Sequence, residues 1–194
     1  MEIYTIVSGK LKNNTYVVKN NNKAIIIDAN ASANEIKKYT DGCEVQGVLI
    51  THGHFDHIES LQDIISTFGC KCYLHPKAID KLFDPGLNES ANFADANIIC
   101  NIDRENLVEV QDEEIINLID KSIEIVYLPG HTDCGVGYII DQTIFSGDTM
   151  FATCYGRTDL QEGDFKKLLK SLKKLMERHG YTLYSGHGDK GKIK

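Results

Sequence analysis

Hydrophobic and polar positions follow two periods along this chain, one typical of strands and one typical of helices. Residues 2–8 and 14–18 alternate apolar and polar side chains around short turns, which predicts a pair of strands. The apolar run 24–27 predicts a buried strand that ends in the carboxylate of Asp28. From Phe165 to Met176 the apolar positions recur every three or four residues with lysines between them, which predicts an amphipathic helix.

The same two periods predict the remaining elements. Further strands are expected at 45–50, 71–74, 107–110, 115–119, 123–128, 135–140, 142–146 and 181–184. Further helices are expected at 30–39, 58–68 and 76–83. Residues 84–105 have little periodicity and predict a long loop over one face. Two strand-rich halves that each carry helices predict two sheets packed face to face, with the helices outside.

Composition and charge narrow the class of function. With 42% hydrophobic and 25% charged residues and no Pro-rich linker, residues 1–194 are expected to form a single domain. The net charge of −7 argues against a nucleic-acid partner or a membrane surface and favours a small-molecule substrate. The N-terminus lacks the pattern of a signal peptide, and no apolar run is long enough to cross a membrane, so we expect a cytoplasmic protein. No pattern specifies an oligomeric state.

Four candidate metal ligands lie within six residues, directly behind the strand predicted at 45–50. They are His52, His54, Asp56 and His57. Imidazole and carboxylate are the usual ligands of zinc and also bind iron and manganese. Asp56 stands where the sequence turns helical, so capping that helix is an alternative role for it. Capping does not require three histidines beside the carboxylate, so the cluster favours a metal site.

Three later turns repeat one pattern, in which a strand is followed by a glycine and then by one strong ligand. The ligands are His131, Asp148 and His187. A lone histidine in a loop is usually solvated or structural, and we expect this of His75, which has no other donor beside it. Together with the first cluster, the three turns account for five of the seven histidines. This concentration predicts one metal centre assembled from distant parts of the chain.

The ligand series resembles that of the metallo-β-lactamase fold hydrolases over nearly the whole chain. The matching residues are His52-x-His54-x-Asp56-His57, His131, Asp148 and His187. The resemblance implies an α/β (α+β) fold, a four-layer αββα sandwich of two mixed β-sheets with outer helices. It also implies two divalent metal ions at one edge of the sandwich. These would most simply be Zn²⁺, with iron and manganese as alternatives.

The resemblance also assigns a role to each ligand. It implies that His52, His54 and His131 hold the first ion, that Asp56, His57 and His187 hold the second, and that Asp148 bridges the two. Asp56 and Asp148 would then be the catalytic carboxylates. Asp28 resembles the family's early aspartate, which supports the ligand loop without binding metal. A simple turn carboxylate is the alternative reading of Asp28.

Segments outside the ligands are similar to the glyoxalase II-like thioesterases, in particular their short, single-domain branch. These segments are 82–88, 145–151, 155–160 and 163–164. The larger members add a helical C-terminal domain that binds glutathione, and this chain is expected to lack it, because only seven residues follow His187. The resemblance therefore implies a dinuclear hydrolase in which a metal-bridging hydroxide attacks the carbonyl of a thioester or activated ester. A thiol leaves as thiolate without needing a proton, which suits such a site.

Two residues near the third turn are candidates for substrate binding. Arg157 is expected to bind a substrate carboxylate, with Tyr155 beside it, because a guanidinium forms paired hydrogen bonds to such groups. A structural salt bridge from Arg157 to Asp159 or Asp164 is the equal alternative. After His131-Thr132 the family usually has Pro-Gly, whereas this chain has Asp133-Cys134. Cys134 is expected to be a small buried residue, with a redox or substrate-contacting role as the alternative.

Other activities share the fold and remain open. One is a mononuclear iron persulfide dioxygenase, against which the retention of Asp56, His57 and His187 argues. Lactonases and nucleases use the same metal core, and a non-catalytic metal-binding module is a further alternative. A β-lactamase is disfavoured by the lack of an export signal and by the presence of both His57 and Asp148.

Overall fold

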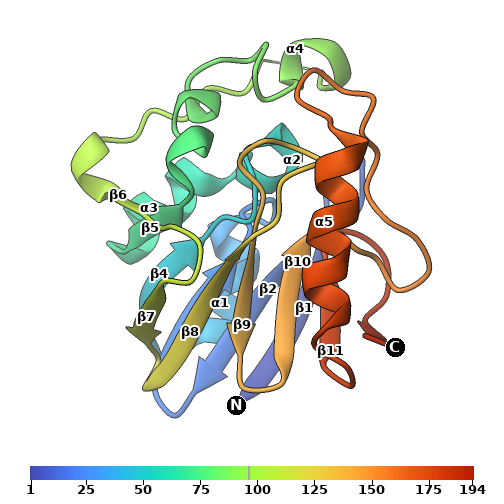
Figure 1. Ribbon diagram of the computed structural model, residues 1–194. Helices are drawn as coiled ribbons and strands as arrows, with labels where there is room; N and C mark the ends of the chain where they lie inside the picture. The colour runs from blue at the N-terminus through green and yellow to red at the C-terminus, as the bar shows by residue number, and fades with distance from the viewer. Residues whose placement is uncertain (96) are drawn as a thin grey trace.

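The computed structural model describes residues 1–95 and 97–194 and contains two six-stranded sheets packed face to face (Figure 1). Helices lie on the outer faces of both sheets. This arrangement confirms the predicted fold class, a four-layer α/β sandwich.

The first sheet carries the N-terminal half of the chain. In spatial order its strands are β1 (Glu2–Ser8), β2 (Asn13–Asn20), β3 (Lys23–Ile27), β4 (Glu44–Leu49), β5 (Lys71–Leu74) and β6 (Leu107–Glu109). Strands β1 to β3 pair antiparallel, whereas β3 to β6 pair parallel. The C-terminal ends of the parallel strands therefore meet at one edge of the sheet.

The second sheet carries the C-terminal half. In spatial order its strands are β12 (Gly191–Lys192), β11 (Thr182–Ser185), β10 (Thr143–Gly147), β9 (Val136–Ile140), β8 (Lys121–Tyr127) and β7 (Ile115–Leu118). Strands β10 and β11 are parallel and the other neighbours are antiparallel. Both sheets are thus mixed, as expected.

Alternation along the strands explains how the layers are filled. In β3, Ile25 and Ile27 belong to the apolar cluster between the sheets, together with Tyr138 and Phe145 of the second sheet. The intervening Ile26 belongs to a different cluster, under the helices of the first sheet. Successive strand residues point to opposite faces, so one buried strand supplies two apolar layers.

Helices and short turns cover the sheets. The helices are α1 (Ala33–Thr40), α2 (Phe55–Ile58), α3 (Leu61–Phe68), α4 (Ser90–Phe93) and α5 (Phe165–Met176), and the 3-10 turns are η1 (Pro76–Ala78), η2 (Asp80–Leu82) and η3 (Arg104–Asn106). Helix α1 begins later than the predicted Asn30 because Ser32 caps it: the Ser32 hydroxyl accepts from the Glu35 amide, and the Glu35 carboxylate accepts from the Ser32 amide. Helix α5 lies on the second sheet, as Figure 1 shows, and matches its predicted bounds.

Three other predicted elements differ from the structure. The helix expected at 58–68 is divided into α2 and α3, because the Ser60 amide donates to the Ala29 carbonyl at 2.7 Å and leaves the helical pattern. The segment 76–83 forms two 3-10 turns, since its amides bond three residues back. The loop expected at 84–105 contains α4 and η3, and β12 was missed.

The site lies where several strands end. The loops after β4, β8, β10 and β11 come together at one end of the sandwich, so residues from both halves of the chain become neighbours. Within the described residues, no helix has the length and apolar character that a membrane crossing demands.

Candidate metal centre

One group of three imidazoles converges on a common point. The Nδ1 atom of His54 lies 3.1 Å from Nε2 of His52 and 3.0 Å from Nε2 of His131. All three residues are buried or nearly so, and one ligand atom from each lies within 4.8 Å of the others. The loops after β4 and β8 therefore bring together the three residues predicted to hold the first ion.

A second group lies beside it. The Nε2 atom of His187 is 3.1 Å from Oδ2 of Asp56, and Nε2 of His57 is 3.8 Å from the same oxygen. Asp148 lies between the two groups: its Oδ1 is 3.5 Å from Nε2 of His57, and its Oδ2 is 3.7 Å from Nε2 of His131. The structure thus brings all seven predicted ligands together, with Asp148 between the two groups.

Asp28 supports both the loop and the second group. Its carboxylate accepts from the backbone amide of Thr51 at 2.8 Å and from Nδ1 of His57 at 2.8 Å. A carboxylate on Nδ1 fixes the imidazole tautomer and leaves the Nε2 lone pair directed at the site. Asp28 does this from a left-handed backbone conformation, with φ of 58°. The geometry matches the supporting role inferred for this residue.

Backbone carbonyls orient two other ligands. Nδ1 of His131 donates to the carbonyl of Arg157 at 2.8 Å, and Nδ1 of His187 donates to the carbonyl of Leu11 at 2.9 Å. Each bond leaves the lone pair of Nε2 free to bind a metal ion. His131 and His187 are therefore held in the same way as His57, with Nε2 facing the site.

Electrostatics within the site favour ionised carboxylates, with His52 and His54 neutral and His187 protonated beside them. Burial and the neighbouring imidazoles lower the pKa of His52 far below its ordinary value and that of His54 to about 3. Burial raises the pKa of Asp148, but His57 and His187 lower it by more, so it lies well below its ordinary value. Burial lowers the pKa of His187, but hydrogen bonds to Asp148 and Asp56 raise it by more, to about 10. The carboxylates therefore attract positive charge to this point, and a bound metal cation would supply that charge.

Polar atoms without hydrogen-bond partners also indicate that a cation fits this site. Among the described residues, Oδ1 of Asp148 is buried without a hydrogen-bond partner, although it belongs to an ionised carboxylate. Such an atom is costly to bury unless a cation or donor faces it. The side-chain amide nitrogen of Asn13 lies 2.9 Å from Nε2 of His57, so an ion bound by His57 would replace this contact. The residues present therefore fit a two-ion centre.

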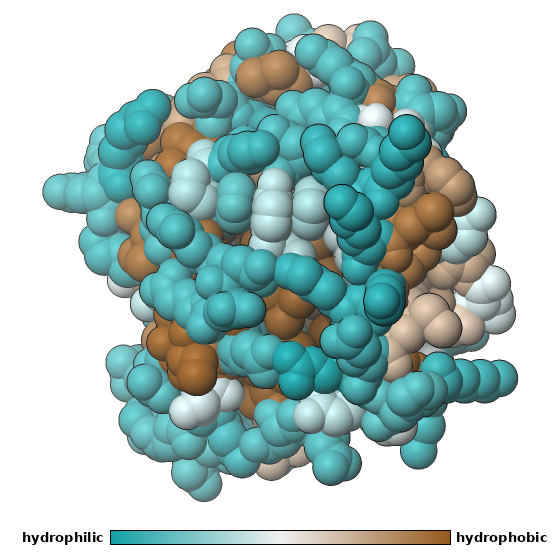
Figure 2. Space-filling view, viewed as in Figure 1, coloured by the Kyte–Doolittle hydropathy of each residue, from teal (hydrophilic) through white to brown (hydrophobic). Residues whose placement is uncertain are grey.

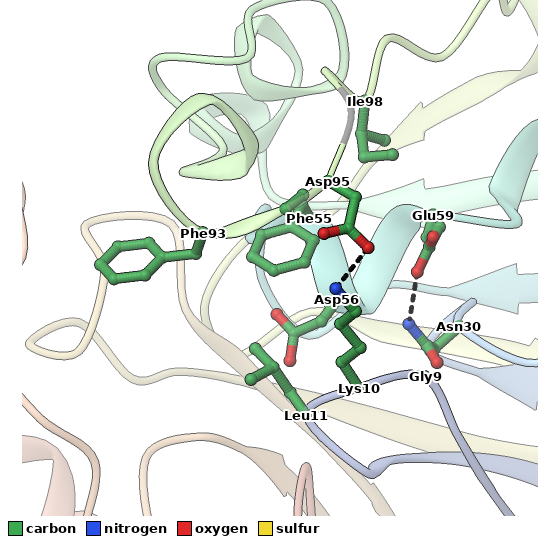
Figure 3. A pocket seen from close by; sticks show the side chains of 11 residues that line it. Gly9, Lys10, Leu11, Asn30, Phe55, Asp56, Glu59, Phe93, Asp95 and Ile98 are labelled. Carbon is green, nitrogen blue, oxygen red and sulfur yellow. Dashed lines mark hydrogen bonds and ion pairs between the residues drawn. The ribbon is translucent and has the colours of Figure 1, made fainter.

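A cavity of about 280 Å³ opens over the site. Beyond the ligands it is lined by Leu11, Phe55, Glu89, Phe93, Arg157 and Leu160. A second cavity of about 260 Å³ shares its Leu11, Phe55, Asp56 and Phe93 wall (Figure 3). Figure 3 shows an ion pair between Lys10 and Asp95 and a hydrogen bond between Asn30 and Glu59 around this second cavity. The space beyond Asp56 is large enough for a substrate that extends past the metal centre.

The two predicted substrate residues have different positions. Arg157 lines the metal cavity, and its guanidinium forms a paired hydrogen bond with Asp159 at 2.7 Å, which is one of the salt bridges weighed from the sequence. Tyr155 is half-exposed, lies near Phe165 and lines a different hollow, beside α5. The structure therefore brings Arg157, and not Tyr155, to the metal cavity.

Two residues discussed from the sequence lie outside the ligand groups. His75 stacks on Tyr127 with ring centroids 4.6 Å apart, and its Nδ1 accepts from the Lys77 amide. Cys134 is fully buried, and its sulfur accepts from the Gly53 amide at 3.4 Å. Both positions agree with structural roles. Sequence reasoning missed Glu89, a cavity-lining carboxylate for which no motif gives a signal.

A mixed αββα sandwich with this cluster of histidines and carboxylates at its edge defines a metallo-hydrolase. The chain belongs to the Metallo-beta-lactamase superfamily, whose family model matches residues 8–187.

Three known proteins illustrate the similarity. The hydroxyacylglutathione hydrolase GloC of Haemophilus influenzae is 29% identical over 171 residues, which cover 85% of this chain and 80% of that protein. The crystal structure of the BLEG-1 B3 metallo-beta-lactamase superposes with a TM-score of 0.93 at 29% identity, covering 99% of this chain and 94% of that one. TTHA1623 in a di-iron-bound form superposes with a TM-score of 0.84 at 25% identity, covering 98% and 94%.

Proposed function

We propose that this chain is a two-ion hydrolase that cleaves a thioester or activated ester of a small acid. The observation that carries the proposal is the position of Asp148, an ionised and buried carboxylate with an unpartnered oxygen between two groups of imidazoles. In this proposal His52, His54 and His131 hold one ion, Asp56, His57 and His187 hold the other, and Asp148 bridges them. Two divalent ions bound there would make a nucleophile available near neutral pH and polarise the carbonyl.

The surrounding residues suit a thioester in particular. The cavity beyond the ligands is mainly apolar, with Glu89 and Arg157 as its charged side chains among the described residues. Arg157 is already paired with Asp159, and the Glu89 carboxylate accepts from the side-chain amide of Asn92. The Arg157 and Glu89 side chains are therefore held in place. A thiol leaves as thiolate and needs no proton donor, whereas an amine expelled from an amide needs one. The similarity to GloC supports the same substrate class.

The closeness of the fold to BLEG-1 makes β-lactam hydrolysis the second candidate. A β-lactam is a strained amide, and its opening places negative charge on nitrogen that must be protonated or held by a cation. Within the described residues that line the cavity, the cationic side chain outside the ligand set is Arg157, which is already paired with Asp159. This favours the thioester over the β-lactam.

The test combines metal analysis with three activities. Purified protein is analysed for zinc, iron and manganese per chain, and then assayed with acyl thioesters, with a β-lactam, and for oxygen uptake with a persulfide. We expect two ions per chain and hydrolysis of thioesters. One iron per chain with oxygen uptake and no hydrolysis would overturn the proposal in favour of a persulfide dioxygenase, and β-lactam turnover alone would favour the second candidate.

Asp148→Ala tests the bridging role directly. Removal of the carboxylate should lower the metal content from about two ions per chain towards one or none and abolish hydrolysis, because both groups lose a shared ligand. Asp159→Ala, which removes an exposed carboxylate on the neighbouring loop, serves as the control and should keep both ions. Full metal content and activity in Asp148→Ala would remove this residue from the bridging position.

A further inference from the structure

A buried lysine lies directly behind the first ligand loop. Lys81, in η2, is only 2% exposed, which is unusual for a charged side chain. Its stem packs against the glycine between His52 and His54: a Cβ atom on Gly53 would lie 2.5 Å from Cδ of Lys81. The lysine therefore fills the space behind the turn that places two ligands of the first group.

The ammonium group joins two further loops. Nζ of Lys81 pairs with Glu162 and lies 3.6 Å from Oδ1 of Asp133. Asp133 stands two residues after His131, and Glu162 belongs to the loop whose Arg157 carbonyl orients the His131 ring. We call Lys81, Asp133 and Glu162 the lysine cluster. Through its packing and its ion pairs, the cluster connects the loop that carries His52 and His54 with the loops that carry His131 and Arg157.

Lys81 keeps its positive charge at neutral pH. Burial lowers the pKa of Lys81, but the neighbouring Cys134, Glu162 and Asp133 raise it by more, so it lies above its ordinary value. Lys77 pairs with the other oxygen of Asp133 at 3.3 Å, from an exposed position. A buried ion pair of this kind is weak evidence for stability, because desolvation offsets its attraction, but it fixes one arrangement of the groups it joins.

The second ligand group depends on different contacts. His57 is held by Asp28, and His187 by the Leu11 carbonyl and by a bridge to Asn13 at the start of β2. These contacts do not involve the lysine cluster. We propose that Lys81 is a positioning residue for the first ion, and that it sets the geometry of His52, His54 and His131 without setting that of the second group. The inference rests on the two-ion site of the proposed function and not on its substrate.

The test measures the affinity of each group for Co²⁺ separately. A His187→Ala background retains the full first group, and a His131→Ala background retains the full second group. In each background, Lys81→Met is compared with Lys77→Met, which removes the exposed cation from the same Asp133. Apoprotein is titrated with Co²⁺ in the presence of a competing chelator, and binding is followed by visible absorption.

We expect Lys81→Met to weaken Co²⁺ binding about 10- to 100-fold in the His187→Ala background, the range found when groups that orient metal ligands are removed. In the His131→Ala background its effect should be less than about 3-fold, and Lys77→Met should have little effect in either background. Equal losses in both backgrounds, as expected of a merely structural residue, would overturn the proposal, and so would an unchanged first group.

Lys81→Met leaves Glu162 and Asp133 without their buried cation and could fail to fold. Lys81→Met/Glu162→Gln removes one charge of each sign and should fold, while still lacking the contact between the loops. It should show the same selective loss in the His187→Ala background. If the unchanged chain bound no Co²⁺ at all, both this proposal and the two-ion site would be wrong, whereas binding that is insensitive to Lys81 would overturn this proposal alone.

Discussion

At the scale of single residues, Asp28 shows how one carboxylate can serve structure and site together. The sequence left two alternatives, a turn residue or a support for the ligand loop, and the contacts in the structure are compatible with both. It ends β3 in a left-handed conformation and accepts hydrogen bonds from Thr51 and His57. Aspartate and asparagine tolerate that conformation better than other residues with side chains, so both identities fit the backbone.

Asp28→Asn tests this support. The amide keeps the shape and the turn but replaces the charged acceptor of the His57 Nδ1 proton, so the second ion should be held about 10- to 100-fold more weakly. The measurement is metal content per chain after dialysis against graded chelator concentrations. Asp41→Asn, at the end of α1, is the matched control and should behave like the unchanged chain. Retention of both ions by Asp28→Asn at every chelator concentration would contradict the role given to Asp28.

The cysteines give a second prediction at this scale. Burial raises the pKa of Cys70 to about 11 and that of Cys100 to about 12, and it also raises those of Cys72 and Cys134. Since the thiolate is the reactive form, these four should resist alkylation at pH 8, whereas the exposed Cys154 should react first. Iodoacetamide labelling followed by mass spectrometry checks the order. Fast labelling of Cys134 in the folded protein would show that its loop opens. It would then support the alternative, a redox or substrate-contacting role for Cys134.

At the scale of elements, the turns that follow the strands explain why each late ligand comes after a glycine. A Cβ atom on Gly130 would lie 2.3 Å from the Leu168 amide of α5, and one on Gly147 would lie 2.5 Å from the Thr51 hydroxyl. On Gly186 it would lie 2.0 Å from Oδ1 of Asp148. Each turn packs against another part of the site, so a side chain there would separate the ligand groups.

Gly186→Ala should therefore disrupt the centre through its shape alone. The added methyl group displaces Asp148, so the variant should lose metal and hydrolysis while its sheets still form. Gly180→Ala is the control: it has open space around it but a φ of 82°, so it should cost only about 1 kcal/mol of stability and keep its metal. Metal content and thermal unfolding are measured for both. A fully metal-loaded Gly186→Ala would show that the turn can move aside.

The strands and helices also differ in how well the sequence predicts them. Strands were predicted to within about two residues because their alternation reflects burial on one or both faces. The division into α2 and α3 was not predicted, because the backbone amide of Ser60 donates to the carbonyl of Ala29. Ala29 is distant in sequence, so no local period reveals this contact. Strand β12 and helix α4 are too short to show a period. Four candidate ligands were predicted from their clustering at 52–57 and three from turns in which they follow a glycine. Lys81 and Glu89, by contrast, carry no local signal.

At the scale of the whole molecule, the two ligand groups each join the two sheets. His52, His54, Asp56 and His57 follow β4 of the first sheet, whereas His131, Asp148 and His187 follow strands of the second. The apolar cluster between the sheets holds them along their length, and the metal centre lies at one end. Bound ions would therefore act as cross-links between halves that are distant in sequence.

Most of the surface in the view of Figure 2 is hydrophilic, with apolar patches between polar ones. The charged ligands, by contrast, are buried, and their carboxylates repel one another unless cations or protons lie between them. Metal-free protein must retain protons on His57 and His187 for this purpose, since neighbouring carboxylates raise the pKa of both despite burial. The folded state therefore gains more from the ions than the unfolded chain does.

Removal of the metal ions by a chelator should then destabilise the protein locally, in the loops that carry the ligands. Ions at about 100 times their dissociation constant add about 2.7 kcal/mol to the free energy of unfolding per site, which corresponds to a fall in melting temperature of roughly 5 to 10 °C when one site is emptied. Hydrogen exchange should rise in the loops after β4, β8, β10 and β11, while amides in the centre of β3 and β9 stay protected by the apolar cluster. Uniformly faster exchange in both sheets would instead mean that the ions, rather than the core, determine the stability of the sandwich. An unchanged melting temperature would mean that the folded chain does not bind the ions at these concentrations, which would contradict the two-ion centre.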